Sequence, residues 1–127
     1  MSIVNAKNAK KYEFGGNCEG YYFLETPGFN VKFEKIPPGS TTSLHYHKEM
    51  TQFFFVKSGV LSIETEKNGP ITLSAGEGVE LSGYDRHRVH NRDKEPVEYL
   101  VAEKYADDCG TYYDQPSSQT MPLSNDV

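Results

Sequence analysis

The chain has 127 residues, which is the length of a single domain. Hydrophobic residues make up 36% and aromatic residues 13% of the sequence, which is enough for a core and too much for a disordered chain. The formal net charge of -5 argues against a general nucleic-acid-binding protein, which would carry a basic face. The longest apolar run is the short Phe53–Val56 stretch, so no transmembrane segment is predicted.

The terminal segments carry no recognisable targeting signal or cofactor motif. Lys7, Lys10 and Lys11 are not followed by an apolar stretch, so no secretory signal is predicted and the cytoplasm is the expected location. Cys18 and Cys109 match no metal-binding or redox spacing. Two free thiols are expected, and a disulfide between the terminal segments is the alternative.

Nine short β-strands are predicted, because runs rich in β-branched and aromatic residues alternate with turns that contain Gly, Pro or Asn. In chain order they are Tyr21–Leu24, Asn30–Ile36, Ser43–His47, Gln52–Lys57, Val60–Glu64, Ile71–Ser74, Gly78–Leu81, Arg88–Asn91 and Val97–Lys104. Such a series is typical of an all-β sandwich or barrel. We expect an N-terminal arm at residues 1–19 that could add an edge strand, the barrel at residues 20–107 and a C-terminal tail at residues 108–127.

All four histidines lie in two short clusters. His45 and His47 occupy positions i and i+2 of a predicted strand, so their imidazoles point to the same face. On the second cluster's strand, His87 and His90 point to opposite faces. If the strands close into a barrel, His45, His47, Gln52 and His87 can converge inside it.

Three imidazoles and one oxygen donor suit a divalent first-row metal such as Fe, Mn, Ni, Cu, Co or Zn. Glu49 is an alternative to Gln52 as the oxygen ligand. Chance is the competing explanation, because a single histidine is more often a structural residue than a ligand. The pattern therefore predicts one metal site without choosing its metal.

The same residues resemble two motifs of the cupin superfamily. The first motif is matched by Gly39-x5-His45-x-His47-x4-Gln52-x6-Gly59, in which Gln52 stands where Glu is usual. The second is similar to Gly76-x5-Ser82-x-Tyr84-x2-His87-x3-Asn91, with Ser82 and Tyr84 in place of the usual Pro and Gly. The resemblance implies a double-stranded β-helix, the jelly-roll cupin barrel, with a divalent metal held by His45, His47, Gln52 and His87.

The ligand set also suggests an activity. Three histidines and one glutamine are similar to the set of small cupins that open unsaturated uronates into linear keto forms. Those enzymes also carry an acid and an arginine near the end of the barrel, where this chain reads Val97–Glu103. The resemblance implies metal-assisted isomerisation or tautomerisation of a sugar acid or keto acid. Because glutamine is neutral, the shell leaves the metal's charge to attract an anionic, chelating substrate.

Three alternatives stay open. The run His45–Lys48 followed by Gln52 is similar to nucleotide-sugar 3,4-ketoisomerases, which act without metal. A metal-dependent dioxygenase and a non-catalytic small-molecule-binding cupin are the other two, because the cupin fold hosts many functions.

Other site residues are predicted from their positions. Tyr84 and Glu49 are candidate catalytic residues, and Phe54, Tyr84 and Tyr99 are candidate substrate-binding residues. The expected partner is a small-molecule ligand, with no nucleic acid and no membrane.

Two surface features complete the predictions. Arg86, Arg88 and Arg92 with His90 form either a basic rim for an anionic substrate or a solvated edge of alternating charge. A homodimer is expected, because Tyr21–Leu24 is too apolar to be left as a bare sheet edge.

Overall fold

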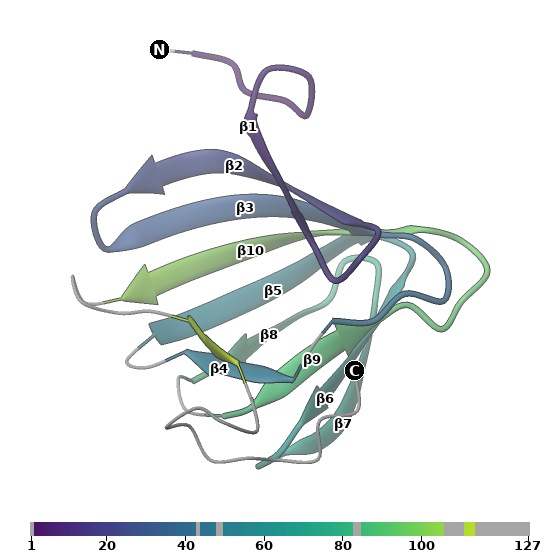
Figure 1. Ribbon diagram of the computed structural model, residues 1–127. Coiled ribbons are helices and arrows are strands. Elements are labelled where there is room, and N and C mark those ends of the chain that lie inside the picture. Colours follow the sequence, from purple (N-terminus) through teal and green to yellow (C-terminus); the bar gives the residue numbers. More distant parts are fainter. Residues whose placement is uncertain (1, 43, 48–49, 83–84, 106–110, 114–127) are drawn as a thin grey trace.

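The computed structural model describes residues 2–42, 44–47, 50–82, 85–105 and 111–113, with the backbone alone described for 45–47 and 111–113 (Figure 1). These residues form eleven β-strands. The strands are β1 (Lys10–Phe14), β2 (Cys18–Thr26), β3 (Phe29–Ile36), β4 (His45–His47), β5 (Met50–Ser58), β6 (Val60–Thr65), β7 (Gly69–Ser74), β8 (Gly78–Leu81), β9 (His87–His90), β10 (Val97–Tyr105) and β11 (Thr111–Tyr113). No helix in the described part of the chain is long and apolar enough to cross a membrane.

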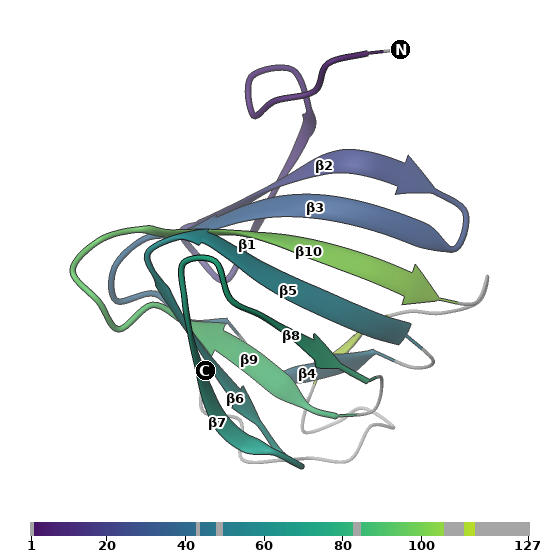
Figure 2. The ribbon, with the colours of Figure 1, turned by 180° about the vertical axis from the view of Figure 1, so that it is seen from behind.

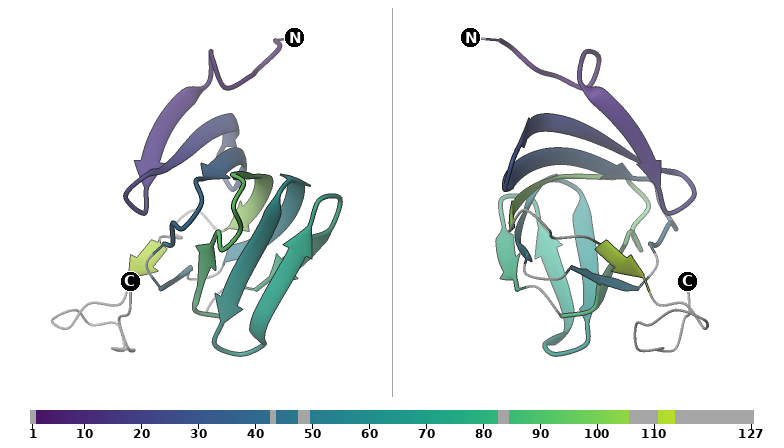
Figure 3. Two further views of the ribbon diagram at one scale, coloured as in Figure 1. Left: turned by 90° about the vertical axis from the view of Figure 1, so that its right-hand side faces the viewer. Right: turned by 60° about the vertical axis from the view of Figure 1, so that its left-hand side comes forward.

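The strands pair into two antiparallel sheets. The six-stranded sheet has the order β1-β2-β3-β10-β5-β8, and the five-stranded sheet has the order β11-β4-β9-β6-β7. Figures 2 and 3 show the two sheets facing each other as the two walls of the fold. Sequence neighbours β5 and β6 lie in different sheets, which is the jelly-roll arrangement. The predicted all-β jelly-roll fold is confirmed.

The strands follow the period-two pattern that their sequences predict. In β5, Gln52, Phe54 and Val56 are buried, whereas Phe53 and Phe55 are exposed. The alternation places every second side chain between the two sheets. The apolar core there consists of Cys18, Ile36, Phe54, Val56, Leu61, Ile63, Leu73, Leu81, Val89, Val97, Tyr99 and Val101.

All nine predicted strands are present, and two further strands join them. Strand β1 lies in the predicted N-terminal arm and pairs with β2 along its length, from Lys10 opposite Tyr22 to Phe14 opposite Cys18. Strand β11 lies in the predicted C-terminal tail and pairs with β4. The sequence of the tail did not predict this strand, because it shows no alternation of apolar and polar residues. A three-residue edge strand depends mainly on pairing with its neighbour, here β4.

The two cysteines are expected to be free thiols. Cys18 is a free, buried thiol, and burial together with the nearby Glu34 carboxylate raises its pKa to about 11. Cys109 lies outside the described residues.

Candidate functional site

His87 is held inside the barrel in a single orientation. It begins β9, is buried, and its ring meets the ring of Phe54 edge-on, with the centroids 6.0 Å apart. Its Nδ1 lies 3.0 Å from the carbonyl oxygen of Asp85. A carbonyl can only accept, so Nδ1 carries the proton and Nε2 carries the lone pair. A metal-ligating histidine is typically oriented in this way.

Gln52 is also buried in the barrel, on the same face of β5 as Phe54. Its Nε2 donates a hydrogen bond to Oε2 of Glu103 at 2.8 Å. This contact fixes the plane of the amide and turns its carbonyl oxygen away from Glu103. The oxygen is the atom that a divalent cation would bind.

The other predicted ligands are placed only by their backbones. Strand β4 pairs with β9, with His45 directly opposite His87. Within the described side chains, which exclude those of His45 and His47, no group of three or more His, Cys, Asp or Glu could hold a metal. The four-residue metal site therefore stays a prediction. Glu49 and Tyr84 lie outside the described residues.

Glu103 is a site residue that the motifs did not reveal. It is 3% exposed on β10 and pairs across the sheet with Gln52. Its Oε2 accepts hydrogen bonds from Gln52 and from Lys32 Nζ, which is 2.7 Å away. The sequence does contain a signal for Glu103. It falls on the same inward-facing side of β10 as Val101, and a carboxylate at a buried position needs polar partners.

A second buried carboxylate lies on the neighbouring strand β3. Glu34 accepts a hydrogen bond from the Tyr99 hydroxyl to Oε1 at 2.6 Å and one from the Tyr12 hydroxyl to Oε2. Burial and the Glu34 carboxylate raise the pKa of both phenols well above the ordinary value, so both remain donors. Lys32 Nζ lies 4.0 Å from the same Oε2.

Lys32 balances part of this negative charge. Burial opposes its charged form, but the carboxylates of Glu34 and Glu103 outweigh burial and raise its pKa. One ammonium group thus faces two carboxylates, and the inner face of β3 and β10 is left with a net negative charge beside Gln52.

The two described candidates for substrate binding line the interior. Phe54 and Tyr99 are buried with ring centroids 5.9 Å apart. The hydroxyl of Tyr99 is bonded to Glu34, so its ring is the part that faces the core. Their contact with a substrate stays a prediction.

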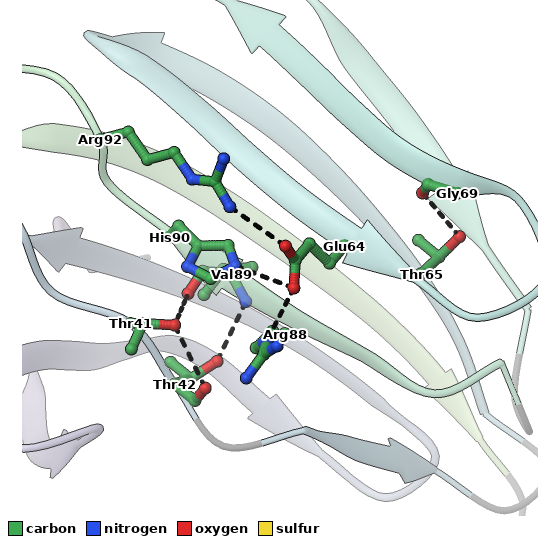
Figure 4. Close-up of polar contacts among 9 residues, drawn as sticks. All are labelled: Thr41, Thr42, Glu64, Thr65, Gly69, Arg88, Val89, His90 and Arg92. Carbon is green, nitrogen blue, oxygen red and sulfur yellow. Dashed lines mark hydrogen bonds and ion pairs between the residues drawn. The ribbon is translucent and has the colours of Figure 1, made fainter. Parts of the chain in front are cut away.

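Three of the predicted basic residues, Arg88, His90 and Arg92, form an ion-pair cluster on the outer face of the five-stranded sheet (Figure 4). Glu64 lies 2.7 Å from Arg88 Nε, 3.0 Å from Arg92 Nη2 and 3.2 Å from His90 Nε2. The hydrogen bond from Arg88, with smaller help from His90, lowers the pKa of Glu64. The predicted separation of His87 and His90 onto opposite faces is confirmed, because Val89 between them packs in the core beside Ile63.

Comparisons with known proteins agree with this fold. The Cupin domain family matches residues 32–103, more than half of the chain. A search of the curated proteins found no significant match. Three similar solved structures are a sugar phosphate isomerase of the cupin superfamily from Silicibacter pomeroyi, a predicted oxalate decarboxylase from Thermotoga maritima and KdgF from a Halomonas species.

The likeness to these three structures is one of fold. The first is 21% identical with a TM-score of 0.70, covering 90% of this chain and 82% of that one. The Thermotoga protein is 16% identical with a TM-score of 0.72, covering 82% and 99%. The Halomonas protein is 16% identical with a TM-score of 0.71, covering 85% and 96%. With both cupin motifs carried on a jelly-roll barrel, this chain belongs to the family of cupin domains.

Proposed function

We propose that the protein is a metal-dependent enzyme that isomerises or tautomerises a small oxygenated metabolite, such as a sugar acid or keto acid. The observation that carries this proposal is the hydrogen bond between Gln52, a predicted metal ligand, and the buried carboxylate of Glu103. This hydrogen bond places a carboxylate that could transfer a proton next to a residue that could hold a carbonyl-polarising metal. The fold likeness to a protein described as a sugar phosphate isomerase supports the same reaction class.

The donor set fits a divalent first-row metal. His87 has its lone pair on Nε2, and the Gln52 amide has its nitrogen committed to Glu103. Together with His45 and His47 these residues would hold the ion, which when bound supplies Lewis acidity toward a carbonyl or carboxylate oxygen. All four ligands are neutral, and this favours an anionic substrate.

Glu103 is the residue that would transfer the proton. Its Oε2 already accepts two hydrogen bonds, whereas its Oε1 makes none to the described part of the chain. Oε1 can therefore take a proton from a carbon next to the substrate carbonyl and return it to a neighbouring atom of the same substrate. Lys32 Nζ, 2.7 Å from Oε2, places a positive charge beside this carboxylate. The number of protons is unchanged over one turnover, as a tautomerisation requires.

Deuterium incorporation from heavy water tests this chemistry on many candidate substrates at once. Metal-loaded protein is incubated with a panel of uronates and keto acids, and exchange next to the carbonyl is followed by NMR. We expect exchange with wild type and a loss of about 10²–10⁴-fold in Glu103→Gln. Glu98→Gln is the matched control, because Glu98 lies on the same strand but pairs with Lys35 and Lys57.

The outcomes separate the candidate functions. A Glu103→Gln variant that folds, holds metal and exchanges at the wild-type rate contradicts the proposal. Oxygen uptake by the iron-loaded protein indicates the dioxygenase alternative. Ligand binding with no exchange in any metal form indicates a binding protein.

A further inference from the structure

A continuous chain of polar contacts runs from the edge strand β1 to Gln52. It passes from Tyr12 to Glu34, then through Lys32 to Glu103. We propose that Tyr12 is a positioning residue of the site. Its hydroxyl donates a hydrogen bond to Glu34, and Lys32 therefore stays paired with Glu103. The functional part of this inference rests on the proposed role of Glu103.

The N-terminal hairpin is built so that Tyr12 can reach Glu34. Tyr12 on β1 lies opposite Gly20 on β2, and Gly20 lies opposite Glu34 on β3. The Tyr12 side chain crosses over Gly20, where an added Cβ would lie only 2.1 Å from Tyr12 Cζ. Only glycine at position 20 leaves room for this crossing. The sheet edge therefore supplies a hydrogen-bond donor two strands further in.

Tyr12 and Lys32 compete for one oxygen atom. Both approach Oε2 of Glu34, while Oε1 is held by Tyr99. Lys32 Nζ stands 4.0 Å from that Oε2 and 2.7 Å from Oε2 of Glu103. If the Tyr12 hydroxyl is removed, a buried carboxylate oxygen loses its donor, and such a loss is costly. Lys32 is the donor near enough to replace it, and we expect its shift toward Glu34 to lengthen the 2.7 Å contact with Glu103.

The prediction concerns the hydroxyl and not the ring. The Tyr12 ring packs on Tyr22, with centroids 4.9 Å apart, and phenylalanine preserves that packing. Tyr22 gives a matched control, because its hydroxyl makes no hydrogen bond to the described residues. A role limited to packing predicts that Tyr12→Phe and Tyr22→Phe behave alike.

Crystal structures and steady-state kinetics of the two variants test the proposal. In Tyr12→Phe we expect Lys32 Nζ within hydrogen-bond distance of Glu34 and further from Glu103 than in wild type. We expect kcat to fall about tenfold with KM unchanged, because the proposed role of Tyr12 acts on the proton-transferring carboxylate and leaves the predicted binding residues as they are. Tyr22→Phe should change neither the contact nor kcat.

A rescue variant sharpens the test. In Tyr12→Phe/Glu34→Gln the competing carboxylate is absent, so Lys32 should return to Glu103 and kcat should recover. Gly20→Ala is a second variant that removes the hydroxyl from Glu34, and it displaces the Tyr12 ring as well, because the added methyl group would lie 2.1 Å from Tyr12 Cζ.

Two results distinguish this inference from the proposed function. If Lys32 stays on Glu103 in Tyr12→Phe, the positioning role is wrong, whatever reaction the protein catalyses. If Lys32 moves but Glu103→Gln exchanges deuterium like wild type, the contact assignment stands and the proposed function is wrong.

Discussion

The side chain at position 52 has two expected interactions, one with the predicted metal and one with the carboxylate of Glu103. An amide suits both, because its oxygen can bind a cation while its nitrogen donates to Glu103 at 2.8 Å. The glutamate that is usual in the cupin motif would bring two buried carboxylates together. The negative charge absent from position 52 is thus present at position 103, one hydrogen bond further from the predicted metal.

Gln52→Glu is therefore expected to destabilise the metal-free protein and to strengthen metal binding. The metal-free variant loses the donor to Glu103, which costs about 2 kcal/mol of unfolding free energy. With metal bound, the added anionic ligand raises metal affinity. Affinity for carboxylate ligands should fall, since the repulsion between like charges about 4 Å apart is on the order of a few kcal/mol.

Chemical unfolding after chelator treatment, metal-competition titration and calorimetry with a carboxylate ligand measure these effects. The double variant Gln52→Glu/Glu103→Gln is the control, because it restores one donor and one acceptor and should recover the metal-free stability. An unchanged metal affinity in Gln52→Glu would mean that Gln52 is not a ligand.

At the scale of elements, β6 and β9 are joined on their outer face by the Glu64 cluster. One carboxylate there faces the side chains of Arg88, His90 and Arg92. Arg88 is buried, so this is an ion-paired surface, whereas the sequence left a basic rim and a solvated edge as alternatives. The cluster lies on the opposite side of β9 from His87. By joining β9 to β6 it stabilises the strand on which His87 lies.

The stability that Glu64 contributes should depend on pH in a defined direction. Its pKa is lowered below the ordinary 4.5, so the contribution is complete above pH 4.5 and is lost as the pH falls through the folded-state pKa. We expect Glu64→Gln to lose about 1 kcal/mol at pH 7. The difference from wild type should vanish in acid.

Thermal unfolding of wild type and Glu64→Gln across this pH range measures the effect. Glu66→Gln is the control, because Glu66 is exposed and makes no ion pair with the described residues. A difference between wild type and Glu64→Gln that does not change with pH would contradict the role of the carboxylate charge.

At the scale of the whole molecule, the outer face of the six-stranded sheet carries exposed apolar side chains beside the ion pairs of Glu98 with Lys35 and Lys57. Leu24, Phe29, Phe53 and Phe55 are 39–46% exposed, and the strand registers place all four on this face. Strand β1 covers the predicted bare edge only in part, because its pairing with β2 ends at Tyr22 and leaves Phe23 and Leu24 without a partner on β1. Exposed apolar surface of this kind typically marks an interaction site.

A homodimer formed through this face is the expected state in solution. Light scattering should give the mass of two 127-residue chains. Phe53→Lys should shift the protein toward the monomer, because a charge would be buried in the interface. Thr72→Lys on β7 of the other sheet is the control and should leave the mass unchanged. A single-chain mass for wild type across micromolar concentrations contradicts the prediction.

Much of the architecture is legible in the sequence by itself. Strand positions and the inward orientation of Gln52 and His87 follow from period-two alternation and from turn residues, and both are local properties of the chain. The cupin spacing adds the fold. These signals do not depend on which strands become neighbours.

The tertiary structure alone decides which polar residues meet. Strand β10 lies between β3 and β5, so Lys32, Gln52 and Glu103 come together although they are far apart in sequence. The reach of Tyr12 across Gly20 likewise depends on the register of β1 against β2. Strand order and register are set by the packing of the entire barrel, and the free energy of that packing is not carried by any one segment.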